Sequence, residues 1–134
     1  VKAHGPEAAE PVEVEGVGRG TAFALPGAPE PAATDGLVRL LGPFDLWLQA
    51  RDRDVVLPDR TRHKTLWPTI GRPGAVLVGV DLVGTWRPKA SGKKLALTLD
   101  AWQPVPPAVR ALVDEQAERL AAHRGVTLTG VVWT

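Results

Sequence analysis

The stretch GRPGAVLVGVDLVGTWRPKASGKKLALTLDAW (residues 71–102) decides the fold, because it contains three β-rich runs with glycine and proline between them. The runs are Ala75–Val78, Leu82–Arg87 and Leu95–Trp102, and in the third run leucine recurs at every second position. This alternation is typical of strands with one buried face, and the glycines and prolines supply the turns. The stretch therefore predicts an antiparallel β meander.

One long helix is predicted after the meander. Pro106-Pro107 suits the start of a helix, where a missing N–H costs little, and Gly125 suits the position just beyond its end. Apolar residues between these ends recur at spacings of three and four, as on a buried helical stripe. They are Val109, Leu112, Val113, Ala117, Leu120 and Ala121. We expect Leu112 and, in the meander, Trp86 to be core residues, and Val126–Trp133 to form a closing strand.

Shorter elements are predicted before the meander. Leu37–Leu41 suits a buried strand, and Pro43–Leu48 predicts a turn followed by a short helical segment. Residues 59–67 predict a short basic helix, with Asp59 as its N-cap and Pro68 at its end. The expected fold class is α+β: an antiparallel β meander packed by one long C-terminal helix and one or two short helices.

Four segments are expected along the chain. Residues 1–11 are rich in Ala, Glu, Pro and Gly without an apolar period, which predicts a disordered tail. Residues 12–25 alternate valine with glutamate, turn at a glycine-rich run and continue as TAFAL, which predicts a β-hairpin. Residues 26–36 have the composition of a linker, and residues 37–134 form the expected C-terminal α+β domain.

Composition excludes several classes of protein. The chain has 134 residues and no Cys, which excludes disulfides, thiolate metal sites and cysteine nucleophiles. No run approaches the roughly 20 apolar residues that span a bilayer, and the N-terminus does not resemble a secretory signal, so we expect a cytoplasmic protein. A start at Val1 without any Met is typical of a processed or partial product. No Ser-His-Asp arrangement or phosphate-binding glycine loop is present, so neither a self-sufficient enzyme nor a cofactor is expected.

Positive charge is concentrated in the middle of the chain. Residues 51–94 hold ten Lys/Arg against four Asp/Glu, whereas the blocks on either side are net acidic. Four cations gather on an expected hairpin tip around Pro88 and Gly92. They are Arg87, Lys89, Lys93 and Lys94. Such a tip can follow phosphates or enter a groove of DNA, and the alternatives are a solvated hairpin end or contact with a partner protein. Trp86 alternates with Arg87, which favours a core role for the indole over base stacking.

A second basic cluster lies on the expected short helix. Arg60, Arg62 and Lys64 can contact phosphates from a helix N-terminus, with a plain solvent-exposed face as the alternative. His63 has no second histidine at ligand spacing, so no metal site is expected. The alternating charges of residues 51–54 predict a salt-bridged loop, anchored to Asp45 by an arginine.

Five short motifs occur together and in order within residues 37–124. They are LGPFD (41–45), RDR (51–53), LPDR (57–60), GRPGAVLV (71–78) and GTWR (84–87). Together they resemble the C-terminal region of the bacterial winged-helix DNA-binding family that includes the azinomycin-resistance and interstrand-crosslink DNA glycosylases. The resemblance implies tandem winged-helix motifs, and the 12–25 hairpin resembles the wing of a preceding unit. It also marks Phe44 and Asp45 as a structural motif, in which the aspartate caps a helix or ties a loop to backbone N–H groups.

The resemblance implies double-stranded DNA as a partner and a catalytic site elsewhere. The family's Gln-x-Gln pair positions a water for attack on the glycosidic carbon, but Gln49, Gln103 and Gln116 are widely separated here. We therefore expect a non-catalytic DNA-binding and scaffolding domain that contacts the N-terminal part of the same protein. A parent protein with glycosylase activity would act on alkylated or crosslinked bases. The alternative is a structural or protein-interaction module without nucleic-acid contact, and salt-sensitive DNA binding distinguishes the two.

Overall fold

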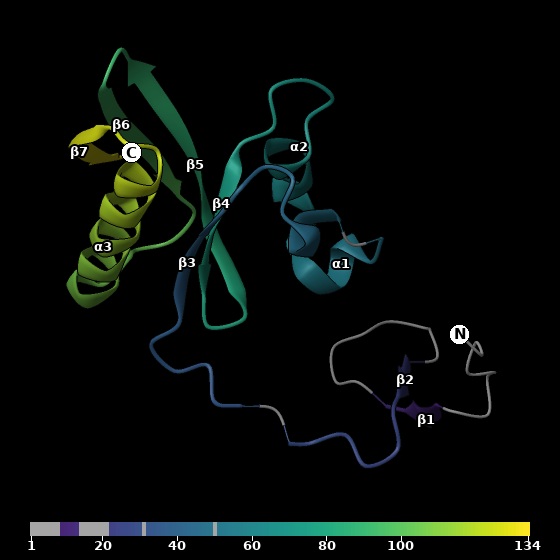
Figure 1. The fold of residues 1–134 in the computed structure, drawn as a ribbon. Coiled ribbons are helices and arrows are strands. Elements are labelled where there is room, and N and C mark those ends of the chain that lie inside the picture. Colours follow the sequence, from purple (N-terminus) through teal and green to yellow (C-terminus); the bar gives the residue numbers. More distant parts are fainter. Residues whose placement is uncertain (1–8, 14–21, 31, 50) are drawn as a thin grey trace, which may run out of the picture. The chain divides into compact units, whose positions relative to one another are not determined.

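The computed structural model describes residues 9–13, 22–30, 32–49 and 51–134 (Figure 1). The chain divides into two compact units, Val1–Ala33 and Thr34–Thr134. All of the candidate site residues predicted from the sequence belong to the second unit.

The first unit contains a short antiparallel pair of strands. β1 (Glu10–Val12) pairs with β2 (Ala22–Ala24), and Glu10 lies opposite Ala24. β1 therefore begins inside the stretch 1–11 that was expected to be a tail. Val14 and the glycine-rich turn of the expected hairpin lie outside the described residues.

A five-stranded sheet in the order β3-β4-β5-β6-β7 organises the second unit. Its strands are β3 (Val38–Leu41), β4 (Gly74–Val78), β5 (Asp81–Ser91), β6 (Lys94–Ala101) and β7 (Thr127–Trp133). The first four are antiparallel neighbours, as in the expected meander. β7 lies parallel to β6, because α3 (Pro107–His123) carries the chain back along the sheet before β7 begins. The expected α+β class is confirmed, with one parallel pair added to the meander.

β5 is longer than the sequence predicts, and its second half has a free edge. Pairing between β4 and β5 stops where Gly74 lies opposite Trp86, so from Arg87 onward β6 is the one strand among the described residues that pairs with β5. Pro88 lies in this second half. A proline has no N–H to give to a ladder, and it is tolerated where a strand has no neighbour on one side.

Of the hairpin tip expected around Pro88 and Gly92, only the Gly92 part is found, because Pro88 is paired with Leu97 within the strand. The chain reverses instead at Gly92 and Lys93, with Ser91 opposite Lys94. Gly92 has a φ of 56°, and glycine with positive φ suits the first position of a tight two-residue hairpin turn.

α3 covers one face of the sheet (Figure 1). Its ends agree with the expected ones, and Gly125 follows with a φ of 65°. Its buried stripe packs against the alternating leucines of β6. The fully buried residues of this core include Val113, Ala117, Leu95, Leu97 and Leu99. Leu112, expected in the core, is only half-buried, because Val113 occupies the position that faces the sheet. No helix in the described ranges is long and apolar enough to cross a membrane.

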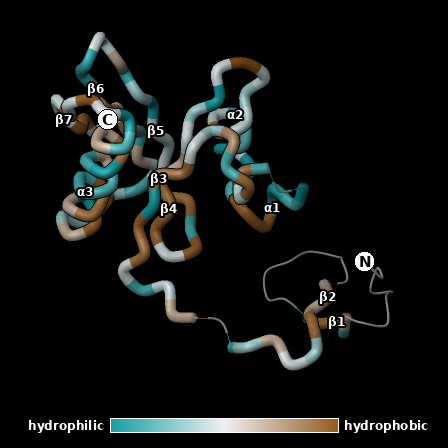
Figure 2. Tube along the Cα trace, viewed as in Figure 1, coloured by the Kyte–Doolittle hydropathy of each residue, from teal (hydrophilic) through white to brown (hydrophobic). Residues whose placement is uncertain are grey.

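Short helices cover the opposite face of the sheet. They are η2 (Leu46–Gln49), α1 (Arg53–Val56), η3 (Arg60–Arg62) and α2 (His63–Leu66). Leu48, Leu66 and Trp67 pack there against Leu77 and Leu82, and form a second core. Figure 2 shows the hydrophobic segments of β3 and β4 between these helices and α3. The helix α1 begins at Arg53 and so replaces the second half of the loop expected at residues 51–54, and Val56 at its end packs against this core.

Candidate nucleic-acid interface

The hairpin formed by β5 and β6 has two chemically different faces. Leu95 and Leu97 point toward α3, so the alternate positions of β6 and their partners on β5 point to the other face. Arg87, Lys89 and Lys94 share this other face, and Lys93 lies in the turn. We call these four residues the basic hairpin.

All four cations of the basic hairpin are exposed. None of them forms an ion pair with a carboxylate within the described part of the chain. Among the described residues the second core includes Leu82 of β5 and none of the residues of the basic hairpin, so these short helices leave the hairpin uncovered. Four unneutralised charges on one uncovered hairpin create a positive potential that attracts a polyanion.

Trp86 is fixed in the core beside this hairpin. Its side chain is 4% exposed, and its Nε1–H donates a hydrogen bond to the carbonyl oxygen of Leu41 at 2.8 Å. Gly74 lies opposite Trp86, and a Cβ on Gly74 would overlap both the indole and the Leu41 carbonyl. Only glycine leaves room for the ring at this point. The indole is therefore a structural group and is not exposed for stacking on a base.

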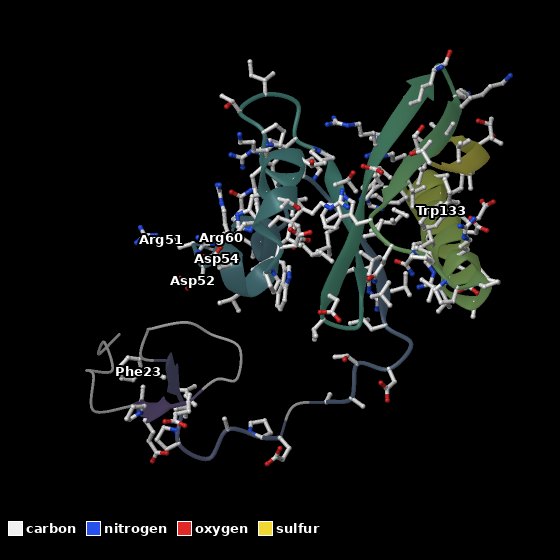
Figure 3. All side chains as sticks on the ribbon, turned by 180° about the vertical axis from the view of Figure 1, so that it is seen from behind. Phe23, Arg51, Asp52, Asp54, Arg60 and Trp133 are labelled. Atoms are coloured by element: carbon white, nitrogen blue, oxygen red, sulfur yellow. The ribbon has the colours of Figure 1, made fainter. Side chains whose placement is uncertain are left out.

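The second basic cluster is partly neutralised. Arg60 forms a two-pronged pair with Asp54, in which Nε donates to Oδ1 at 2.9 Å and Nη2 donates to Oδ2 at 2.5 Å (Figure 3). The hydrogen bonds and charge of Asp54 raise the pKa of Arg60 above its ordinary value. Arg62 Nε lies 3.6 Å from Asp59 Oδ2. Lys64 is exposed and takes part in no ion pair among the described residues, so this cluster offers less free charge than the basic hairpin.

Asp45 ties a turn to the backbone. Its Oδ1 accepts a hydrogen bond from the N–H of Trp47 at 2.9 Å, at the start of η2. The expected arginine anchor is wrong: Asp54 pairs with Arg60 instead, and no ion pair to Asp45 is found among the described residues. Phe44 is 75% exposed, so this member of the motif lies outside the core.

His63 has a packing role in the second core. Its Nε2 lies 2.7 Å from the carbonyl oxygen of Leu57, and its ring meets Trp67 edge-on with 5.0 Å between centroids. Within the described ranges, no group of three His, Asp or Glu side chains could hold a metal ion.

Sequence reasoning missed a pocket beside the free edge of β5. Its volume is about 310 Å³, and Arg72, Arg87 and Arg124 line it together with Trp86 and Pro88. No lining residue is a carboxylate. The three arginines belong to the loop before β4, to β5 and to the C-terminal end of α3, so only the tertiary fold brings them together. We call this cavity the arginine pocket.

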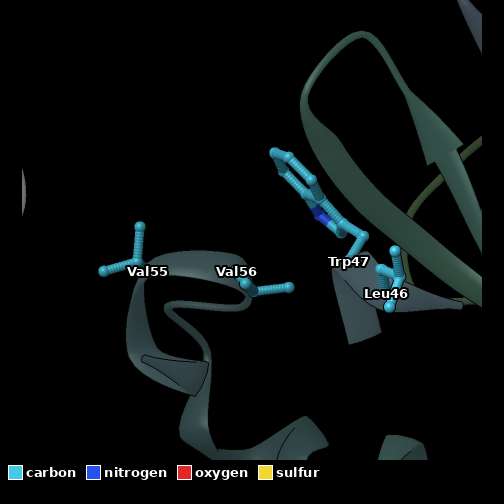
Figure 4. A pocket seen from close by; sticks show the side chains of 4 residues that line it. All are labelled: Leu46, Trp47, Val55 and Val56. Carbon is cyan, nitrogen blue, oxygen red and sulfur yellow. The ribbon is translucent and has the colours of Figure 1, made fainter. Parts of the chain in front are cut away.

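An apolar pocket of about 340 Å³ lies between η2 and α1. It is lined by Leu46, Trp47, Val55 and Val56. Figure 4 shows Val56 pointing toward Trp47 and Leu46. Leu46 is 88% exposed, and Trp47 and Val55 are also among the exposed large hydrophobic residues.

The sequence matches the protein-family model described as DNA glycosylase AlkZ-like over residues 2–123. This match extends beyond the motifs of residues 37–124 and includes the first unit. The fold is similar to that of the DNA glycosylase AlkZ of Streptomyces sahachiroi, with a TM-score of 0.65 and 24% sequence identity. The alignment covers 96% of this chain and 34% of AlkZ, so the chain spans about a third of that protein's length. None of the curated proteins matches the sequence.

Proposed function

The chain belongs to the AlkZ-like DNA glycosylase family, and from this we propose that it binds the backbone of double-stranded DNA through the basic hairpin and supports the catalytic part of a larger glycosylase. The observation that carries the proposal is the set of four exposed cations on the uncovered hairpin, none of them paired within the described residues. Arg60, Arg62 and Lys64 contribute less, because Asp54 and Asp59 already lie close to two of them.

Backbone contact is better supported than base reading. The basic hairpin presents lysines and an arginine, which neutralise phosphates without distinguishing sequences. Its core neighbour Trp86 is buried, so it offers no aromatic surface to an unstacked base. Binding is therefore expected to be similar for unrelated duplexes, with an affinity in the non-specific range of about 10⁻⁴ to 10⁻⁶ M.

The scaffolding role is supported by the distribution of glutamines. Gln49 ends η2, Gln103 follows β6 and Gln116 lies within α3, so no Gln-x-Gln pair is formed by this chain. We assign the chemical step, cleavage of the N-glycosidic bond of an alkylated or crosslinked base, to the rest of an AlkZ-like protein. The β1–β2 pair is proposed as the wing of a preceding winged-helix unit.

A second candidate function is favoured by the apolar pocket between η2 and α1. Its exposed side chains suit a module that contacts protein rather than nucleic acid. On this alternative the basic hairpin is only a solvated surface, and DNA binding is absent.

Salt-dependent DNA binding tests the proposal. If about three or four hairpin cations meet phosphates, log K falls against log salt with a slope of roughly −3, at about −0.9 for each phosphate. Lys93→Glu combined with Lys94→Glu removes two contacts, so binding weakens and the slope flattens by about 1.8. A control with the same charge change, Arg51→Glu combined with Arg119→Glu, alters exposed arginines away from the hairpin.

The two candidate functions give different outcomes in this titration. A larger loss of affinity in the lysine variant than in the arginine control supports the hairpin contact. Equal affinities and slopes for the wild type and the lysine variant refute it and favour the protein-interaction module. Circular dichroism should show all three proteins folded, since exposed charges contribute little to stability.

A further inference from the structure

We propose that the arginine pocket is a phosphate-binding site, and that in the DNA complex it holds one phosphodiester of the backbone. The preference for phosphate rests on the pocket alone, whereas its assignment to DNA rests on the proposed function. The chemistry shared by both sources, a free phosphate ion or a DNA backbone, is a tetrahedral oxyanion.

The pocket exists because two neighbouring strands end at different levels. β4 stops pairing at Gly74, while β5 continues through Arg87 and Pro88 with β6 as its strand partner and no described strand on its other side. The chain before β4 supplies Arg72, and the end of α3 supplies Arg124. The step between the two strand ends therefore leaves a recess, and its three arginines come from three separate segments of the chain.

The charge of the residues that line the arginine pocket indicates the kind of ligand it can bind. Three arginines line it, no carboxylate does, and none of the three forms an ion pair within the described part of the chain. The C-terminal end of α3 contributes an opposing partial charge of only about −0.5. Three full positive charges outweigh it, so the pocket favours an anion.

The residue type narrows the choice of anion. Arginine presents a planar fork of N–H donors that matches phosphate oxygens in pairs, which a lysine cannot do. The volume of about 310 Å³ is at the lower end of the range for ligand pockets, roughly 300–1,000 Å³, so it suits a small group rather than an extended molecule.

The wall of the pocket is rigid before any ligand arrives. Trp86 is held by its hydrogen bond to Leu41, and Gly74 packs directly against the indole. Pro88 fixes its own backbone dihedral on the other side. A preformed wall reduces the entropy lost on binding, and the indole surface lowers the local dielectric around the arginines.

Arginine side-chain NMR tests the phosphate site without DNA. Inorganic phosphate is titrated into the chain at constant ionic strength, and the Nε–H signals of all arginines are followed. We expect saturable shifts at Arg72, Arg87 and Arg124, with little change at Arg51 and Arg119. Arg72→Gln combined with Arg124→Gln should abolish the saturable shift at Arg87, and the matching lysine variant should restore only part of it. Absence of saturation, or equal shifts at Arg51 and Arg119, overturns the site.

A DNA titration with the same glutamine variant tests the source of the phosphate. The pocket contributes one phosphodiester, so the salt slope of the variant should be less negative by about 0.9. Arg51→Gln combined with Arg119→Gln should leave the slope unchanged. Phosphate binding with an unchanged DNA slope would refute the backbone assignment and identify a site for free phosphate.

The failure of this inference differs from the failure of the proposed function. Suppose that Lys93→Glu with Lys94→Glu abolishes DNA binding, while the glutamine variant binds DNA and phosphate as the wild type does. The DNA contact of the basic hairpin is then supported, and the phosphate site in the arginine pocket is refuted. If the glutamine variant no longer binds phosphate while neither variant changes DNA binding, the phosphate site is supported and the proposed DNA contact is refuted. Thermal unfolding verifies that each variant is folded.

Discussion

Gly74→Ala should destabilise the second unit, because the new methyl group would occupy space already filled by the Trp86 indole and the Leu41 carbonyl. The indole is buried and the other obstacle is a backbone carbonyl, so neither can move away freely. Overpacking of this kind costs about 1–3 kcal/mol. Displacement of the indole also breaks the Trp86–Leu41 hydrogen bond, with a net cost of about 0.5–1.5 kcal/mol. We expect a loss of about 2–4 kcal/mol, or on the order of 10–20 °C in Tm.

Urea unfolding measures this change, and Gly42→Ala provides the matched control. A Cβ on Gly42 meets no atom within 4 Å, and its φ is not positive, so this substitution should change the free energy of unfolding by less than about 1 kcal/mol. A cycle with Trp86→Phe isolates the contact, because Gly74→Ala should cost less when the smaller ring is present. Equal unfolding free energies for Gly74→Ala and Gly42→Ala would refute the close packing of Gly74 on Trp86.

Three further predictions address the core, the acid response and catalysis. Leu97→Ala should cost roughly 2–5 kcal/mol, because Leu97 is 0% exposed, and the half-buried Leu112→Ala should cost clearly less; similar values in urea unfolding would contradict the placement of α3. Asp59 accepts hydrogen bonds from the hydroxyl and the backbone N–H of Thr61, and these lower the pKa of the Asp59 carboxyl below its ordinary value of 3.8. The charged Asp59 carboxylate therefore stabilises the folded chain fully above its ordinary pKa, and this stabilisation disappears as the pH falls through the folded-state pKa. The difference in unfolding free energy between the wild type and Asp59→Ala, which removes the acceptor that asparagine would keep, should shrink in acid; a constant difference from pH 7 to pH 2 would exclude a charged cap. The purified chain should release no alkylated base from DNA, and release that a substitution within the chain abolishes would overturn its non-catalytic role.

The elements that depend on neighbours in sequence could be predicted. The leucines of β6 alternate, and prolines and a glycine mark the ends of α3, so both were located from local patterns. The parallel pairing of β7 with β6 and the continuation of β5 through Pro88 depend on partners far along the chain. A period of two predicts a strand, but it does not specify which strand lies beside it or where that neighbour ends.

The candidate site divides in the same way. The basic hairpin is visible in the sequence because its cations lie within eight residues of one another. The ion pair of Arg60 with Asp54 could not be predicted from the sequence, because it forms only where the short helices α1 and η3 meet. The arginine pocket could not be predicted, because Arg72, Pro73 and Gly74 of the GRPG motif (71–74) are neighbours in sequence at the start of β4, whereas the other two arginines lie far along the chain. Arg124 lies at a helix end, where a cation is already explained by the helix dipole.

The free edge of β5 also bears on self-association. An unpaired strand edge is a template on which a second molecule can add its own strand. Pro88 removes one donor from this edge, and Arg87 and Lys89 place like charges along it, so an approaching copy meets both a gap in the ladder and repulsion. Neutral replacements at these positions would remove the repulsion and allow dimers or aggregates to form. Charge at the hairpin is therefore expected to keep molecules apart in addition to any contact with DNA, and light scattering on each variant tests this.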